Sequence, residues 1–171
     1  MIKTKRLMIE PFDMKYLEKY FEGFNSEITK YQWPDPFETI EDAKMLLQDF
    51  IKEMEAEESL FYSILNAEGD FIGSVEVHGL SGECPELGVW IIEQEQKMGY
   101  AYEALSEVLD YANKNYHRTA FFYEADIRNE GSTKLLHKLE DQFEIITQNL
   151  DEVTTESGKD LKLQGYVLKA K

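Results

Sequence analysis

The sequence predicts one α+β domain over residues 1–171: a mixed, mostly antiparallel sheet with one strand–helix–strand crossover. Three observations predict this fold. The 171 residues are 43% hydrophobic, which is enough for one packed core, and no stretch has the composition of a linker. Consecutive strand-like segments joined by short turns indicate an antiparallel meander. A strongly amphipathic helical segment between two later strand-like segments indicates the crossover.

The first third of the chain is expected to form a strand and two helices. Residues 7–12 read as a short strand, and Asp13 is suited to cap a helix in which apolar residues recur at helical spacing: Tyr16, Leu17, Tyr20, Phe21 and Phe24. Residues 25–37 are irregular. Thr39 and Asp42 have the spacing of a capping box, and one apolar stripe follows: Ile40, Ala43, Leu47, Phe50, Ile51 and Met54.

The middle of the chain predicts the meander and the crossover helix. Residues 60–66 and 71–80 are strand-like and flank a turn at 67–70, and residues 86–92 form the third strand. The pattern then changes to a strong helical one, with apolar positions at Ala101, Ala104, Leu105, Val108, Leu109 and Ala112.

The last third predicts strand, helix and a final strand pair. Residues 119–127 are strand-like and residues 129–139 form a short amphipathic helix. Residues 143–147 and 161–168 are the expected strand pair. The polar segment between them, residues 148–160, is expected to be a mobile loop.

Charge and composition exclude several classes of function. Eighteen Lys and Arg stand against 34 Asp and Glu, for a net charge of −16. Such a surface repels phosphate backbones, which predicts no nucleic-acid and no membrane partner and favours cationic ones. The first residues lack the apolar core of a signal peptide, no apolar run is long enough to span a bilayer, and Cys84 is the only cysteine. We therefore expect a cytoplasmic protein.

The transition between residues 92 and 100 is the first place where the sequence predicts binding. A buried strand stops there, a short loop follows, and a helix begins near Gly99. The first N–H groups of a helix lack intrahelical acceptors and carry a partial positive charge, and glycine lets an anion approach them. The loop is thus suited to hold a phosphate with main-chain donors.

Three ordered motifs resemble one family. The run Gln96-Lys97-Met98-Gly99-Tyr100-Ala101 is similar to the Gln/Arg-x-x-Gly-x-Gly/Ala signature of the GNAT superfamily of acyl-CoA-dependent N-acyltransferases. Glu86–Ile91 and Gly99–Leu105 resemble the ribosomal-protein-acetyltransferase-like branch, as does the Asn-x-x-Ser turn at Asn129. The resemblance covers nearly the whole chain. It implies a GNAT-like sheet with helices on both faces and the crossover at the acyl-CoA site.

The resemblance also implies a set of cofactor contacts. Acetyl-CoA would be the co-substrate, and its pyrophosphate would meet the main-chain N–H groups of Gln96, Lys97, Met98, Gly99, Tyr100 and Ala101. The free edge of the strand at Val89, Trp90 and Ile91 would pair with the pantetheine arm, as a peptide adds to a sheet. Asn129 would anchor the loop near pantetheine, or serve only as a turn or cap residue.

Two residues are the expected catalytic groups. The acceptor ammonium, with a pKa of about 10.4, must lose a proton before it attacks. Glu86 is the first choice for that base, ahead of His78 and Glu76; its alternative role is to hold the strand end or the loop. Many GNAT enzymes place a proton-donating tyrosine where this chain has Leu136, so Ser132 is the candidate donor to the thiolate, or else only the N-cap of its helix.

Trp33, Tyr31, Phe37 and Trp90 are candidates for an aromatic acceptor pocket, with core packing as the alternative. No histidine or cysteine has zinc-ligand spacing, so no metal is predicted. The expected reaction is direct transfer of an acetyl group to a primary amine in a ternary complex. The acceptor is a protein or peptide N-terminus, or a small polyamine-like molecule. The alternative is a CoA-binding sensor or interaction module with little catalysis. The resemblance leaves a homodimer open.

Overall fold

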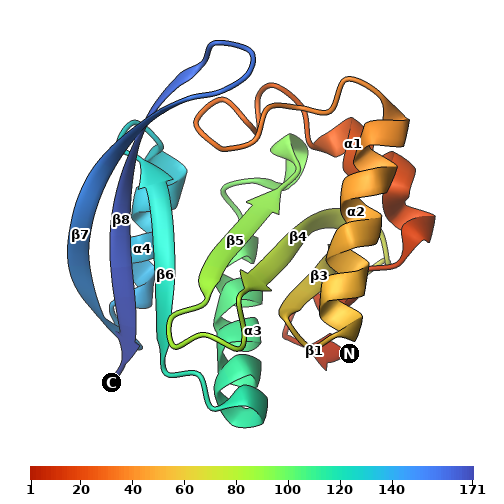
Figure 1. Ribbon diagram of the computed structural model, residues 1–171. Helices are drawn as coiled ribbons and strands as arrows, with labels where there is room; N and C mark the ends of the chain where they lie inside the picture. The colour runs from red at the N-terminus through yellow and green to blue at the C-terminus, as the bar shows by residue number, and fades with distance from the viewer.

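The computed structural model describes residues 1–171 and contains one eight-stranded mixed sheet with helices on both faces (Figure 1). The strand order is β1-β2-β3-β4-β5-β6-β8-β7, and every neighbouring pair is antiparallel except β5 and β6. The strands are β1 (Ile2–Lys3), β2 (Met8–Pro11), β3 (Ser59–Leu65), β4 (Phe71–His78), β5 (Glu86–Ile91), β6 (Ala120–Asp126), β7 (Phe143–Thr154) and β8 (Asp160–Ala170). The predicted α+β fold is therefore confirmed.

Four α-helices cover the sheet in two layers: α1 (Leu17–Gly23), α2 (Ile40–Glu55), α3 (Tyr100–Tyr116) and α4 (Glu130–Leu139). The apolar stripes of α3 and α4 pack in a core with Leu87 and Ile91 of β5. The aromatic residues of α1 and the stripe of α2 pack on the opposite face with Trp90. Strand alternation explains this division, since neighbouring residues of one strand point to opposite faces. The helices predicted from apolar periodicity thus lie on both faces of the sheet.

The predicted helix starts rest on side-chain caps. Asp13 accepts a hydrogen bond from the Lys15 N–H at 2.8 Å, although the turn it begins is a short 3-10 helix (Met14–Tyr16) that leads into α1. Thr39 Oγ1 accepts from the Asp42 N–H at 3.2 Å, so the predicted start of α2 is confirmed.

The sheet is interrupted between β5 and β6. These parallel strands pair only at Glu86 and Phe122, where the Phe122 N–H also donates to the Pro85 carbonyl at 2.8 Å. Beyond that point β5 leans away from β6 (Figure 1). The edge of β5 that faces β6 therefore has no strand partner from Gly88 to Ile91.

The expectation of a mobile loop over residues 148–160 is wrong. β7 continues to Thr154 and pairs with β8 from Leu150–Gln164 to Thr154–Asp160, after a bulge beyond Thr147. Main-chain hydrogen bonds make this ladder, and they need no apolar side chains on a solvated edge strand. The polar composition of the segment therefore gave no strand signal.

No helix in the structure combines the length and the apolar character that crossing a membrane requires.

Candidate active site

A cavity of about 390 Å³ opens where β5 and β6 part. Four predicted site residues line it: Glu86, Val89, Asn129 and Ser132. Glu86 and Val89 come from β5, and Asn129 and Ser132 come from the start of α4. β6, the loop over residues 25–37, β7 and β8 supply the remaining walls.

Glu86 lies at the one point where β5 still pairs with β6. Its side chain is exposed to the cavity and forms no hydrogen bond or ion pair with another protein group. A carboxylate in this position can accept a proton from an amine that enters the cavity.

The preceding strand places a second set of titratable groups beside Glu86. His78 of β4 is in register with Glu86, and Glu76 is in register with Gly88. His78 Nε2 lies 3.0 Å from Glu76 Oε2, and Nδ1 lies 3.7 Å from Glu53 of α2. The hydrogen bond to Glu76 raises the pKa of His78, against the opposing effect of burial. His78 is therefore held by Glu76 and Glu53, and neither it nor Glu76 lines the cavity.

Glu124 is a cavity residue that sequence reasoning missed. It lies on β6, two residues beyond the partner of Glu86, and lines the cavity with it. Burial and the nearby carboxylates of Glu86 and Asp151 raise the pKa of Glu124. Strand alternation from Phe122 would have located it, but only once the pairing of β5 with β6 was known. Two carboxyl groups and no Lys or Arg side chain thus line the cavity.

The start of α4 distinguishes between the two roles considered for Ser132. The cap is Asn129, whose Oδ1 accepts from the Ser132 N–H at 3.1 Å, so the N-cap alternative for Ser132 is wrong. Ser132 lies in the first turn of the helix and lines the cavity. Its carbonyl accepts from the Tyr123 hydroxyl at 3.1 Å. Burial raises the pKa of Tyr123 to about 12, so this phenol stays neutral.

The predicted aromatic pocket is divided between the cavity and the core. Tyr31 and Trp33 line the cavity, and Trp33 is 56% exposed. Phe37 and Trp90 pack with Tyr20 and Phe24 instead. Leu136, at the position of the tyrosine found in many GNAT enzymes, is buried in the core and has no group that can donate a proton.

The loop between β5 and α3 carries a row of main-chain donors outside this cavity. The N–H groups of Lys97, Met98 and Gly99 donate no hydrogen bond within the protein. Those of the first turn of α3 lack intrahelical acceptors, and Gly99 gives the helix no side-chain cap. Lys97 and Gly99 both have a positive φ, 65° and 83°. The geometry suits an anion bound by backbone donors.

Side-chain contacts hold this loop at both of its ends. Gln96 Nε2 donates to the Ile91 carbonyl at 3.0 Å, which closes the loop on the end of β5. Arg6 Nη1 donates to the Met98 carbonyl at 2.8 Å, and Arg6 Nε lies 2.7 Å from Glu103 Oε2. The hydrogen bonds from Thr4 and Arg6 outweigh burial and lower the pKa of Glu103.

The sequence analysis does not predict the pairing of Glu103 with Arg6. The two residues lie 97 positions apart, so no local pattern indicates the contact.

Of the predicted cofactor residues on β5, Trp90 and Ile91 can offer a ligand only their main-chain groups. The side chains of Trp90 and Ile91 are buried in opposite cores, while the β5 edge toward β6 lacks a partner strand. Amide groups of an extended ligand can therefore pair with β5 there. No group of three or more His, Cys, Asp or Glu side chains is arranged to hold a metal ion.

Comparison with known proteins places this arrangement in a family. The model of the acetyltransferase (GNAT) domain matches residues 6–140, well over half of the chain. An uncharacterized N-acetyltransferase of Bacillus subtilis (strain 168), YoaA, is 26% identical over 142 residues, which cover 81% of this chain and 80% of that protein.

Solved structures share the fold over nearly the whole chain. A spermidine N-acetyltransferase from Vibrio cholerae, in complex with CoA and spermine, has a TM-score of 0.80 at 16% identity, with 97% of each chain covered. RimL, a ribosomal L7/L12 alpha-N-protein acetyltransferase in complex with coenzyme A, has a TM-score of 0.81 at 14% identity, with 98% of this chain and 96% of that chain covered. The chain therefore belongs to the GNAT family of acetyltransferases and is an acetyl-CoA-dependent N-acetyltransferase.

Proposed function

We propose that residues 1–171 act as one domain that acetylates a cationic primary amine in the cavity between β5 and β6, with Glu86 as the general base. The observation that carries this proposal is the position of Glu86: an unpaired carboxylate, exposed to the cavity, on the strand whose free edge adjoins Asn129 and Ser132.

The cofactor contacts proposed here use the main chain. The donors from Lys97 to Ala101 face the pyrophosphate, whereas the predicted Gln96 N–H is not available, because it donates to the Glu93 carbonyl at 3.3 Å. The β5 edge from Val89 to Ile91 pairs with the pantetheine amides, and Asn129 lies near the thiol end. The unpaired N–H groups of Lys97, Met98 and Gly99 and the unpaired strand edge support this assignment. Acetyl-CoA supplies an activated acetyl thioester.

The chemistry proposed for the side chains is a pair of proton movements. Glu86 removes a proton from the acceptor ammonium, so that the nitrogen lone pair can form the new amide bond. A β5 main-chain N–H stabilises the negative charge that develops on the carbonyl oxygen. The Ser132 hydroxyl holds the proton that passes to the departing sulfur, because Leu136 has none to give.

The charge of the cavity supports a cationic acceptor. Glu86 and Glu124 both line it, and Asp151 lies near enough to raise the pKa of Glu124. Solved relatives include one enzyme named for spermidine and one named for a ribosomal protein N-terminus, so both kinds of amine are probes for the assay. The buried Leu136 favours a second candidate, a CoA-binding sensor with little catalysis.

Replacing Glu86 separates the two candidates. We expect Glu86→Gln to lower kcat/KM for spermidine or a short peptide by about 100-fold or more, measured by thiol release, because the base is lost. Acetyl-CoA binding, measured by thermal shift, should not change.

Glu83→Gln is the matched control, because Glu83 is exposed in the preceding loop and makes no side-chain contact. Undiminished turnover in Glu86→Gln would rule out Glu86 as the base. A wild type that binds acetyl-CoA and acetylates no amine would establish the sensor.

A further inference from the structure

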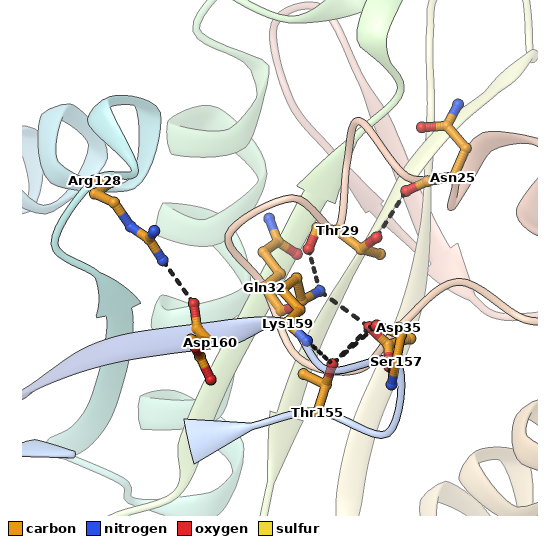
Figure 2. Close-up of polar contacts among 9 residues, drawn as sticks. All are labelled: Asn25, Thr29, Gln32, Asp35, Arg128, Thr155, Ser157, Lys159 and Asp160. Atoms are coloured by element: carbon orange, nitrogen blue, oxygen red, sulfur yellow. Dashed lines mark hydrogen bonds and ion pairs between the residues drawn. The ribbon is translucent and has the colours of Figure 1, made fainter. Parts of the chain in front are cut away.

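The loop over residues 25–37 is fastened to the tip of the β7–β8 hairpin by a cluster of polar contacts (Figure 2). Lys159 Nζ donates to the carbonyls of Thr29 at 2.6 Å and Gln32 at 2.8 Å, and lies 3.4 Å from Asp35 Oδ1. Asp35 in turn accepts from the N–H and the hydroxyl of Ser157, at 3.0 and 2.8 Å. We name the residues Asp35, Thr155, Ser157 and Lys159 the clasp.

The polar groups of the partly buried clasp are paired with one another. The side chains of Lys159 and Asp35 are each 21% exposed. The lysine has three donors, and two carbonyls and one carboxylate are within reach of them. Thr155 is buried, and its hydroxyl donates to Asp35 Oδ1 at 3.0 Å. Partly desolvated, charge-assisted hydrogen bonds of this kind fix geometry more firmly than an exposed ion pair.

Arg128 makes a second connection between the same segments. Its Nη2 donates to the Asp160 carbonyl at the start of β8, at 2.8 Å, and its guanidinium carbon lies 4.9 Å from the centre of the Tyr31 ring. Asp126 holds the guanidinium through two hydrogen bonds of 2.8 Å. The 25–37 loop and the hairpin are thus joined to each other and to the end of β6.

The fastened segments form the outer walls of the cavity. The loop contributes Tyr31, Gln32 and Trp33, and the hairpin contributes Val153. In Figure 1 the hairpin tip, in blue, meets the orange loop above the gap between β5 and β6.

The two walls border the space in front of Glu86. The cavity volume of about 390 Å³ lies at the small end of ligand-sized sites, roughly 300–1,000 Å³. Ser132 and Asn129, which we place near the acetyl group and the thiol, line the same space. The room left for the acceptor therefore suits a slender chain better than a folded domain.

We propose that the clasp is a specificity determinant that restricts the acceptor to a free, small or slender amine and rejects the same amine on a folded protein. This inference rests on the proposed function, since it assumes that the acceptor reacts in this cavity. The clasp residues act by positioning the two walls and take no part in the chemistry.

Paired probes test the restriction. One pair is spermidine and spermidine tethered by its far amine to a folded carrier; the other is a short peptide and the same residues at the N-terminus of that carrier. For whichever pair the wild type acetylates, we expect Lys159→Met to lower the ratio of kcat/KM for the free to the carried amine about tenfold or more, because the wall opens. Asp35→Asn should lower the same ratio.

Lys162→Met is the matched control, because Lys162 is exposed on β8 and its side chain makes no polar contact. Its ratio should equal that of the wild type. A wild type that acetylates free and carried amines equally well, or a ratio that Lys159→Met leaves unchanged, would overturn the proposal.

Hydrogen exchange separates this proposal from the proposed function. Lys159→Met should speed amide exchange in residues 25–37 and in residues 150–160 together, and Lys162→Met in neither. Unchanged exchange in Lys159→Met would show that the clasp does not hold the walls, whatever the enzyme acetylates. Faster exchange in a protein that releases no thiol with any probe would instead refute the function and leave the clasp as a structural fastening.

Discussion

His78 lies among carboxylates from three elements. Glu76 of β4 binds it directly, Glu53 of α2 and Glu86 of β5 add negative charge, and the Phe50 ring packs edge-on against it. The hydrogen bond to Glu76 raises the pKa of His78, so the folded protein holds this proton more tightly than the unfolded chain does.

The stabilisation by His78 should therefore be complete below its ordinary pKa, about 6.5, and should fade as the pH rises through the raised value. Between about pH 6 and about pH 8.5, the free energy of unfolding, measured in urea, should therefore decrease less in His78→Gln than in the wild type. Parallel pH profiles for the two proteins would contradict this account of His78. His117→Gln is a control, because it changes an exposed histidine with no side-chain contact.

Asp126 is fully buried at the end of β6 and has the opposite dependence. The hydrogen bonds from the Arg128 guanidinium lower the pKa of Asp126 to about 2, with further bonds from the N–H groups of Arg128 and Lys162. The stabilisation is present above the ordinary aspartate pKa of about 3.9 and is lost as the pH falls through about 2.

We expect Asp126→Asn to lower the free energy of unfolding by about 2 kcal/mol at neutral pH, and the difference from the wild type to shrink as the pH approaches the lowered pKa. Denaturant titrations across the acid range measure both quantities. A difference that stays constant with pH would mean that packing, and not ionisation, sets the cost of the substitution.

At the scale of elements, the N-terminal segment contacts and orients the loop before α3. Arg6 binds the Met98 carbonyl and Glu103, and its guanidinium carbon lies 4.5 Å from the centre of the Tyr100 ring. It thus joins the chain start to the proposed pyrophosphate site.

We expect Arg6→Met to weaken acetyl-CoA binding about tenfold, because the loop donors lose their fixed orientation, with kcat little changed. Isothermal titration measures the affinity. Lys5→Met removes the same charge from an exposed neighbour without a side-chain contact and should bind as the wild type does. Equal affinities in Arg6→Met and Lys5→Met would show that Arg6 does not orient the loop.

Elements with a strong local signal were predictable. Apolar periodicity located α2, α3 and α4, and the N-cap residue Thr39 indicated the start of α2. The outer half of the β7–β8 hairpin was not predictable, because main-chain pairing on a solvated edge leaves no apolar pattern.

At the scale of the whole molecule, predictability fell with separation along the chain. Glu86, Asn129 and Ser132 were predictable as cavity residues because each lies within a recognisable motif near the start of an element. The position of Glu124 in the cavity depends on how β6 pairs with β5, and the clasp joins residues 120 or more positions apart. Polar contacts between distant loops have no periodicity, so only the folded chain brings them into view.

The single point of pairing between β5 and β6 divides the sheet into a five-stranded and a three-stranded part. Apart from that point, the main-chain ladder through the middle is missing one strand. An extended ligand that fills the gap would act as that strand and bond to the larger part along the free edge of β5. The bound ligand would then complete the sheet of its own enzyme, and each turnover would remove and restore one strand of that sheet.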